Sequence, residues 1–295
     1  MKYIRKIWSA SWRILVLFGG WAGLIAVLVV PVLSRHATHG VALAPGLRLY
    51  VETVSLLSVL GAVWLMLRFV DCRPFLSLGF GANHAWQDWI IGLAIGFTML
   101  ALVVSALIIF GWANWSNAAG LSASAVNTGT LAILLNTVTQ EVLVRGYVQQ
   151  TIQLRFGGVP GILISSLFFL ALHLGAIGGQ LLPAVSLFAA GVLLGTAYAV
   201  SGQLWLPIAL HFAWNALQGP ILGGAVSGQK LDTGPRLIEI TGPPLMTGGA
   251  FGLEGGLVAI AITILATPAV FILYRRRRLS MQPSANKKQA RTTPQ

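Results

Sequence analysis

Long runs of apolar residues, most of them without a charged side chain, recur along the whole chain. A helix needs about 20 such residues to cross the hydrocarbon core of a bilayer, and these runs approach or reach that length. They cover residues 14–33, 53–70, 89–110, 131–148, 159–174, 181–200, 204–217 and 251–274. The sequence therefore predicts an all-α, polytopic membrane protein of about eight transmembrane helices.

The composition supports lipid as the main solvent of the folded chain. Hydrophobic residues make up 56% of the 295 residues and charged residues 9%, whereas an ordinary globular protein has about 45–50% and 25%. So few charged side chains cannot cover a water-facing surface, which excludes a soluble globular protein and a disordered chain. The single cysteine, Cys72, excludes a disulfide-rich secreted module.

The net charge of +12 does not indicate nucleic acid, because the basic residues lie beside apolar runs instead of alternating with aromatic residues. Lysine and arginine next to a span mark its cytoplasmic end and contact anionic lipid headgroups. If the N-terminus is inside, eight crossings leave only Arg35, Arg48, Lys230 and Arg236 outside. We therefore predict a multi-pass protein of the cell membrane with both termini in the cytoplasm and no nucleic-acid partner.

The order of runs and loops predicts the domain organisation. An N-terminal extension of two membrane helices precedes a core, an outer loop, a last transmembrane helix and a basic, disordered cytoplasmic tail. Their ranges are residues 1–72, 73–217, 218–250, 251–274 and 275–295. The outer loop is rich in Gly and Pro, and we expect it to be partly ordered as a lid. No internal repeat is visible, which argues against a transporter built from duplicated halves.

Two acidic residues near the ends of the runs have simple structural interpretations. Glu52 lies one turn from Arg48, and we expect these side chains to pair at a helix end. Glu254 lies near the start of the last run, where a carboxylate suits a helix N-terminus.

Polar residues also lie deep inside three of the runs. Glu141 is ten residues from the start of its run, which is roughly 15 Å into the bilayer at about 1.5 Å per residue. Arg145 follows four residues later and can reach Glu141 from the same face. His173 stands alone in the next run, whereas His211 and Asn215 are four residues apart and project from one helical face.

Each of these polar sites has a structural alternative. They could be a buried ion pair, a packing histidine and a hydrogen-bonded pair between helices. However, they lie on different runs at similar depth, so they can meet near the middle of the membrane. A carboxylate, two imidazoles and an amide supply a base for water and donors for an oxyanion. Together they predict a hydrolytic site.

The three sites resemble the signature motifs of a known family. Gln140-Glu141-x-x-x-Arg145-Gly146, Phe169-x-x-x-His173 and His211-x-x-x-Asn215 are similar, in order and spacing, to those of the CPBP intramembrane proteases. That family includes the type II CAAX prenyl endopeptidases and the bacterial abortive-infection-like and bacteriocin self-immunity proteins. The resemblance covers the core of about residues 73–217.

The resemblance implies an intramembrane endopeptidase whose active site lies inside the bilayer and opens towards the cytoplasm. In the family, a glutamate activates water, and a histidine with an asparagine stabilises the oxyanion. The implied catalytic residues are Glu141, His173, His211 and Asn215, and the residues that orient the site are Gln140, Arg145 and Phe169. The implied substrates are membrane-associated peptides, lipid-modified ones among them. No cofactor is expected; zinc is the minority alternative, because two histidines and a carboxylate could also bind it.

The sequence departs from the family at Gln140. The usual motif begins with two glutamates, of which the first is the base, and an amide cannot take a proton from water at neutral pH. Either Glu141 is the base, or the protein is a non-catalytic member that acts as an immunity or scaffold protein. We favour Glu141, because Arg145 lies one turn away to pair with it.

Overall fold

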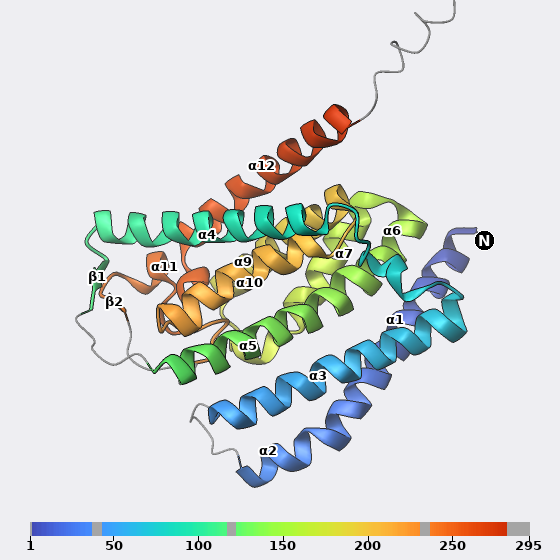
Figure 1. The fold of residues 1–295 in the computed structure, drawn as a ribbon, viewed down its shortest axis with the longest axis horizontal. Coiled ribbons are helices and arrows are strands. Elements are labelled where there is room, and N and C mark those ends of the chain that lie inside the picture. Colours follow the sequence, from blue (N-terminus) through green and yellow to red (C-terminus); the bar gives the residue numbers. More distant parts are fainter. Residues whose placement is uncertain (1, 37–42, 117–121, 231–236, 282–295) are drawn as a thin grey trace, which may run out of the picture.

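The computed structural model describes residues 2–36, 43–116, 122–230 and 237–281. It is almost entirely helical (Figure 1). Its longer helices are α1 (Lys2–Leu28), α2 (Val30–His36), α3 (Pro45–Leu65), α4 (Ala85–Ile109), α5 (Ala123–Glu141), α6 (Gln150–Phe156), α7 (Gly158–Ala171), α9 (Leu181–Ser201), α10 (Trp205–Ala216) and α12 (Leu257–Met281). The π-helices η1 (Met66–Asp71), η3 (Val142–Gln149) and η4 (Leu217–Ile221) continue α3, α5 and α10, and short turns and two strands complete the fold.

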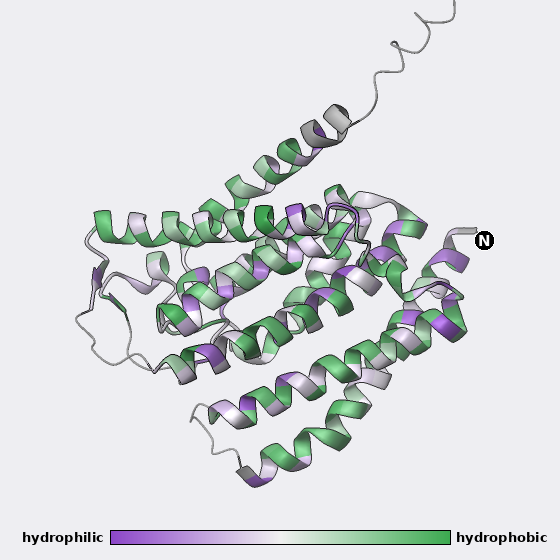
Figure 2. Ribbon diagram, viewed as in Figure 1, coloured by the Kyte–Doolittle hydropathy of each residue, from purple (hydrophilic) through white to green (hydrophobic). Residues whose placement is uncertain are grey.

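Among the described residues, five helices are long and apolar enough to cross a membrane. They are Tyr3–Arg35, Pro45–Asp71, Ala85–Ile109, Leu181–Ser201 and Leu257–Arg275. The protein is therefore an all-α, multi-pass membrane protein, but the predicted count of about eight spans is not confirmed. The three remaining predicted runs, 131–148, 159–174 and 204–217, are those that carry the polar site. Hydrophobic residues run along most of α4 and α12 (Figure 2).

Small residues let α4 approach α10 closely. A Cβ atom added at Gly92 would lie 2.7 Å from the Cβ of Ala209, and one added at Gly96 would lie 2.8 Å from the Cβ of Ala213. Residues of this kind, four apart on each helix, are typical of close helix pairs in membranes. Because His211 lies between the two alanines, this contact fixes the height of the site on α10.

A second close contact holds α7 against α9. A Cβ atom added at Gly191 would lie 2.8 Å from the Cβ of Ser166, so only glycine fits this position. Helices α5, α7, α9 and α10 form the centre of the bundle, with α4 and α12 on one side and α1 and α3 on the other (Figure 1).

Basic residues from distant segments meet at one end of the bundle. Arg13 Nε lies 2.9 Å from Asp71 Oδ1, and Tyr147 donates its hydroxyl to the other oxygen of Asp71 at 2.8 Å. Lys6 donates to the Arg155 carbonyl at 3.0 Å. Lys6, Arg13 and Arg155 therefore share one end, as the charge pattern predicts. Which side of the membrane this end faces stays a prediction.

The segment predicted as the outer loop lies at the opposite end (Figure 1), and the structure describes its residues 218–230 and 237–250. Strand β1 (Ala113–Trp115) pairs antiparallel with β2 (Ile238–Ile240), which belongs to the loop. Short helical turns follow at α11 (Pro244–Thr247), η5 (Gly249–Phe251) and η6 (Leu253–Gly255). Helix α12 begins six residues after the predicted start at 251 and continues beyond 274, so the basic run 275–278 is helical. Residues 282–295 of the predicted tail lie outside the described residues.

Candidate active site

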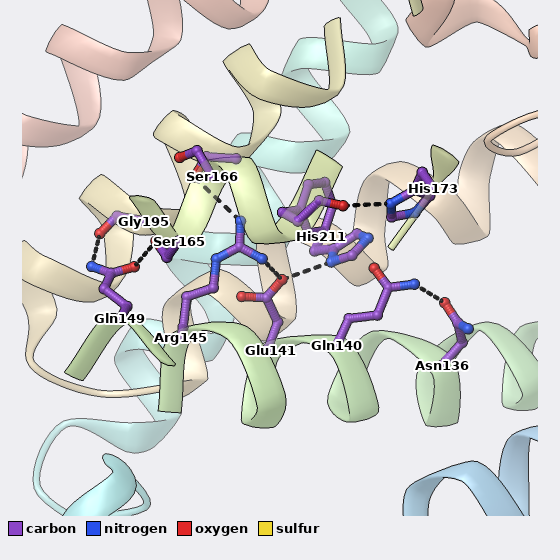
Figure 3. A network of polar contacts seen from close by, with 12 residues as sticks. Asn136, Gln140, Glu141, Arg145, Gln149, Ser165, Ser166, His173, Gly195 and His211 are labelled. Carbon is purple, nitrogen blue, oxygen red and sulfur yellow. Dashed lines mark hydrogen bonds and ion pairs between the residues drawn. The ribbon is translucent and has the colours of Figure 1, made fainter. Parts of the chain in front are cut away.

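Glu141 is the last residue of α5, where the α-helix changes to the π-helix η3. Its carboxylate is fully buried, and Oε1 accepts hydrogen bonds from Arg145 Nη1 at 3.0 Å and His211 Nδ1 at 2.9 Å (Figure 3). The predicted pairing of Glu141 with Arg145 is confirmed. Glu141 Oε2 has no hydrogen-bond partner among the described residues.

Arg145 is buried and contacts residues of two other helices, α9 and α7. Its Nη2 donates to the Gly191 carbonyl of α9 at 3.2 Å, and its guanidinium lies 4.4 Å from the ring centroid of Phe169 on α7. The Phe169 ring also contacts the rings of His173 and His211, at centroid distances of 4.9 and 5.7 Å. Arg145 and Phe169 between them therefore contact the carboxylate and both histidines.

His173 lies just beyond α7, in the turn before α8 (Leu174–Ile177). Its Nδ1 lies 2.8 Å from the Phe169 carbonyl oxygen. A carbonyl can only accept a hydrogen bond, so Nδ1 carries the proton. In the neutral ring, Nε2 is then free to accept a hydrogen bond from water.

Two cavities lie beside these residues, and Asn215 lines both. The first, of about 60 Å³, is lined by Phe169, His211 and Asn215 together with leucines of α9. The second, of about 40 Å³, is lined by Gln140, His173 and Asn215 together with residues of α3 and the outer loop. Glu141 lines neither of the two. The structure thus brings the four predicted catalytic residues together, but it does not place them around a single cavity.

Gln140 points away from the ion pair. Its Nε2 donates to Asn136 Oδ1 at 2.8 Å (Figure 3), while its buried Oε1 has no hydrogen-bond partner within the described ranges. Gln140 Oε1 can accept a hydrogen bond from water, but as an amide oxygen it cannot take a proton from it. The position at which the family carries its first glutamate therefore supplies no base.

The expected pairing of Glu52 with Arg48 is wrong. Glu52 Oε2 instead accepts a hydrogen bond from Asn136 Nδ2 at 2.9 Å, and Arg48 donates to Gln229 at 2.8 Å. No ion pair joins Glu52 to Arg48 in the part of the chain that the structure describes. The packing of α3 against α5 brings Glu52 to the second cavity, and local spacing contains no signal of this contact.

The expected role of Glu254 at a helix N-terminus is also wrong. Helix α12 begins three residues later, and the Glu254 carboxylate accepts hydrogen bonds from Trp214, Gln218 and Ser227. It lines the first cavity and joins the outer loop to α10 and η4.

No group of three or more His, Cys, Asp or Glu residues could hold a metal ion within the described residues. That the protein works without a cofactor stays a prediction.

Residues 122–217 match the family model described as type II CAAX prenyl endopeptidase Rce1-like. The type II CAAX prenyl endopeptidases belong to the CPBP family, so the family that this segment matches is the one that the three motifs resemble. The match runs from the start of α5 to the end of α10 and contains every predicted site residue, so the resemblance is confirmed where the site lies. It leaves out α3. No curated protein and no solved structure matches the chain.

Proposed function

We propose that the protein is an intramembrane endopeptidase that hydrolyses membrane-associated peptides, lipid-modified ones among them. The observation that carries this proposal is the buried Glu141–His211 hydrogen bond, with Asn215 one turn away beside two cavities. The match to a protease family over the same helices supports it.

His211 and Asn215 are suited to stabilise the oxyanion of a tetrahedral intermediate. The Glu141 carboxylate holds His211 through Nδ1, and in the imidazolium form of His211 this leaves Nε2–H to donate to the oxyanion. The Asn215 amide supplies a second donor from the same helical face. Preorganised donors in a site without water contribute strongly to catalysis, because they need no reorganisation during the reaction.

We assign Glu141 to holding His211 and not to activating water. Its Oε1 accepts hydrogen bonds from Arg145 and His211, and although its Oε2 has no partner among the described residues, Glu141 lines neither cavity in which a water could be held. This assignment differs from the role that the sequence favours for Glu141.

The test is cleavage of a library of membrane-associated peptides, with and without lipid modification, by purified protein in vesicles. We expect His211→Ala and Asn215→Ala to lower kcat about 10²–10³-fold, as for the loss of an oxyanion donor. His84→Ala is the matched control, because His84 is exposed at the start of α4. Wild-type protein that cleaves no peptide would support the non-catalytic alternative, and loss of cleavage with a chelator would indicate a metal.

A further inference from the structure

A carboxylate from outside the family-matched segment reaches the candidate site. Glu52 lies near the start of α3, and Asn136 of α5 connects it to Gln140. Asn136 donates to Glu52 Oε2 at 2.9 Å and accepts from Gln140 Nε2 at 2.8 Å. The Asn136 side chain therefore links Glu52 to Gln140, the position at which the family carries its first glutamate.

Glu52 also shares a cavity with two of the candidate catalytic residues, His173 and Asn215. The second cavity, about 40 Å³ in volume, is lined by Glu52, Gln140, His173 and Asn215. A water molecule occupies about 30 Å³ in the liquid and needs two to four polar partners in a protein. The cavity offers the Glu52 carboxylate, the free Gln140 Oε1 and the His173 ring, so it is suited to hold one water.

The other buried carboxylates are less suited to contact this water. Glu141 has one oxygen, Oε2, without a hydrogen-bond partner among the described residues, but this residue lines neither cavity, and its Oε1 accepts from Arg145 and His211. Glu254 accepts hydrogen bonds on both oxygens. Glu52 receives one hydrogen bond, on Oε2, and within the described residues no donor contacts its Oε1.

We propose that Glu52 is the general base that activates the hydrolytic water, in place of the carboxylate missing at Gln140. The proposal rests on the endopeptidase function proposed above. Arg48, one turn before Glu52, lines the same cavity and places a positive charge beside the base.

The reaction then proceeds in two steps. The Glu52 carboxylate takes a proton from the cavity water as the water oxygen bonds to the peptide carbonyl carbon. The C=O π electrons move to the oxygen, which accepts hydrogen bonds from His211 and Asn215. As the C=O bond re-forms, the C–N bond breaks and Glu52 gives its proton to the departing nitrogen. The products are a carboxylic acid and an amine, and Glu52 is a carboxylate again.

The experiment moves the carboxylate back to the family position. Glu52→Gln keeps an acceptor for Asn136 but removes the base, so we expect kcat to fall about 10²–10⁴-fold with little change in KM. Adding Gln140→Glu to Glu52→Gln places a carboxylate on the same cavity and is expected to restore most of kcat. Thermal unfolding of each variant reports whether it is folded. Glu239→Gln, at an exposed carboxylate on β2, is the matched control.

Comparison of the Glu52 and His211 variants distinguishes failure of this proposal from failure of the endopeptidase proposal on which it rests. A folded Glu52→Gln protein with wild-type kcat overturns the role of Glu52, while loss of activity in His211→Ala still supports the endopeptidase. Loss in Glu52→Gln without rescue by Gln140→Glu would indicate packing or substrate binding, and it also overturns the role of Glu52 as base. Wild-type protein without cleavage overturns both proposals.

Discussion

The buried guanidinium of Arg145 holds several helices of the bundle in contact. It pairs with Glu141, donates to the carbonyl of Gly191 and stacks on Phe169, so three helices depend on it. The planar fork of arginine suits such contacts, whereas lysine offers a compact point charge.

We expect Arg145→Ala to lower the free energy of unfolding by about 3–5 kcal/mol, because it leaves the buried Glu141 carboxylate without its cation. Arg145→Lys should recover only part of this loss, since lysine cannot replace both contacts and the stacking. Reversible unfolding in detergent micelles measures both variants, with Arg5→Ala at an exposed position as the control. A loss below about 1 kcal/mol for Arg145→Ala would contradict a stabilising ion pair.

At the scale of helices, local patterns predict some of the structure well. The run 181–200 corresponds to Leu181–Ser201, and the four-residue spacing predicts the contact between Glu141 and Arg145. The π-helix η3 is not predicted, because its hydrogen-bond pattern leaves no trace in apolar periodicity. The contact between Glu52 and Asn136 joins residues 84 apart and depends on how α3 packs, so no local pattern can reveal it.

The close contact between α4 and α10 gives a prediction at this scale. Gly96→Ala places a Cβ atom 2.5 Å from the Leu210 carbonyl oxygen, and we expect overpacking to cost about 1–3 kcal/mol. Because α10 carries His211 and Asn215, cleavage should also decrease. Gly61→Ala is the matched control: within the described structure, no atom outside its own helix turn lies within 4 Å of the added Cβ. Equal stability of the two variants would contradict a tight α4–α10 contact.

For the whole molecule, the positions of the cavities and of the basic residues predict the side of the membrane towards which the site opens. Both cavities are lined by Ser227 of the outer loop, so they reach towards the loop end of the bundle. Figure 1 shows the strands of that end opposite α6 and the start of α1, the helices that carry Arg155 and Arg13. The positive-inside rule places the basic end in the cytoplasm. If it does, the cavities lie nearer the outer side, whereas the family resemblance implies a site that opens towards the cytoplasm.

The single cysteine can decide between these orientations without a fusion protein. Cys72 is exposed and directly follows the span that ends at Asp71, beside the contact between Arg13 and Asp71. We expect a membrane-impermeant thiol reagent to leave Cys72 unlabelled in intact cells and to label it after permeabilisation. Lys230→Cys in a Cys72→Ser background provides the opposite control, because Lys230 is exposed on the outer loop and should be labelled in intact cells. Labelling of Cys72 in intact cells would reverse the predicted orientation and place the loop end, with both cavities, on the cytoplasmic side.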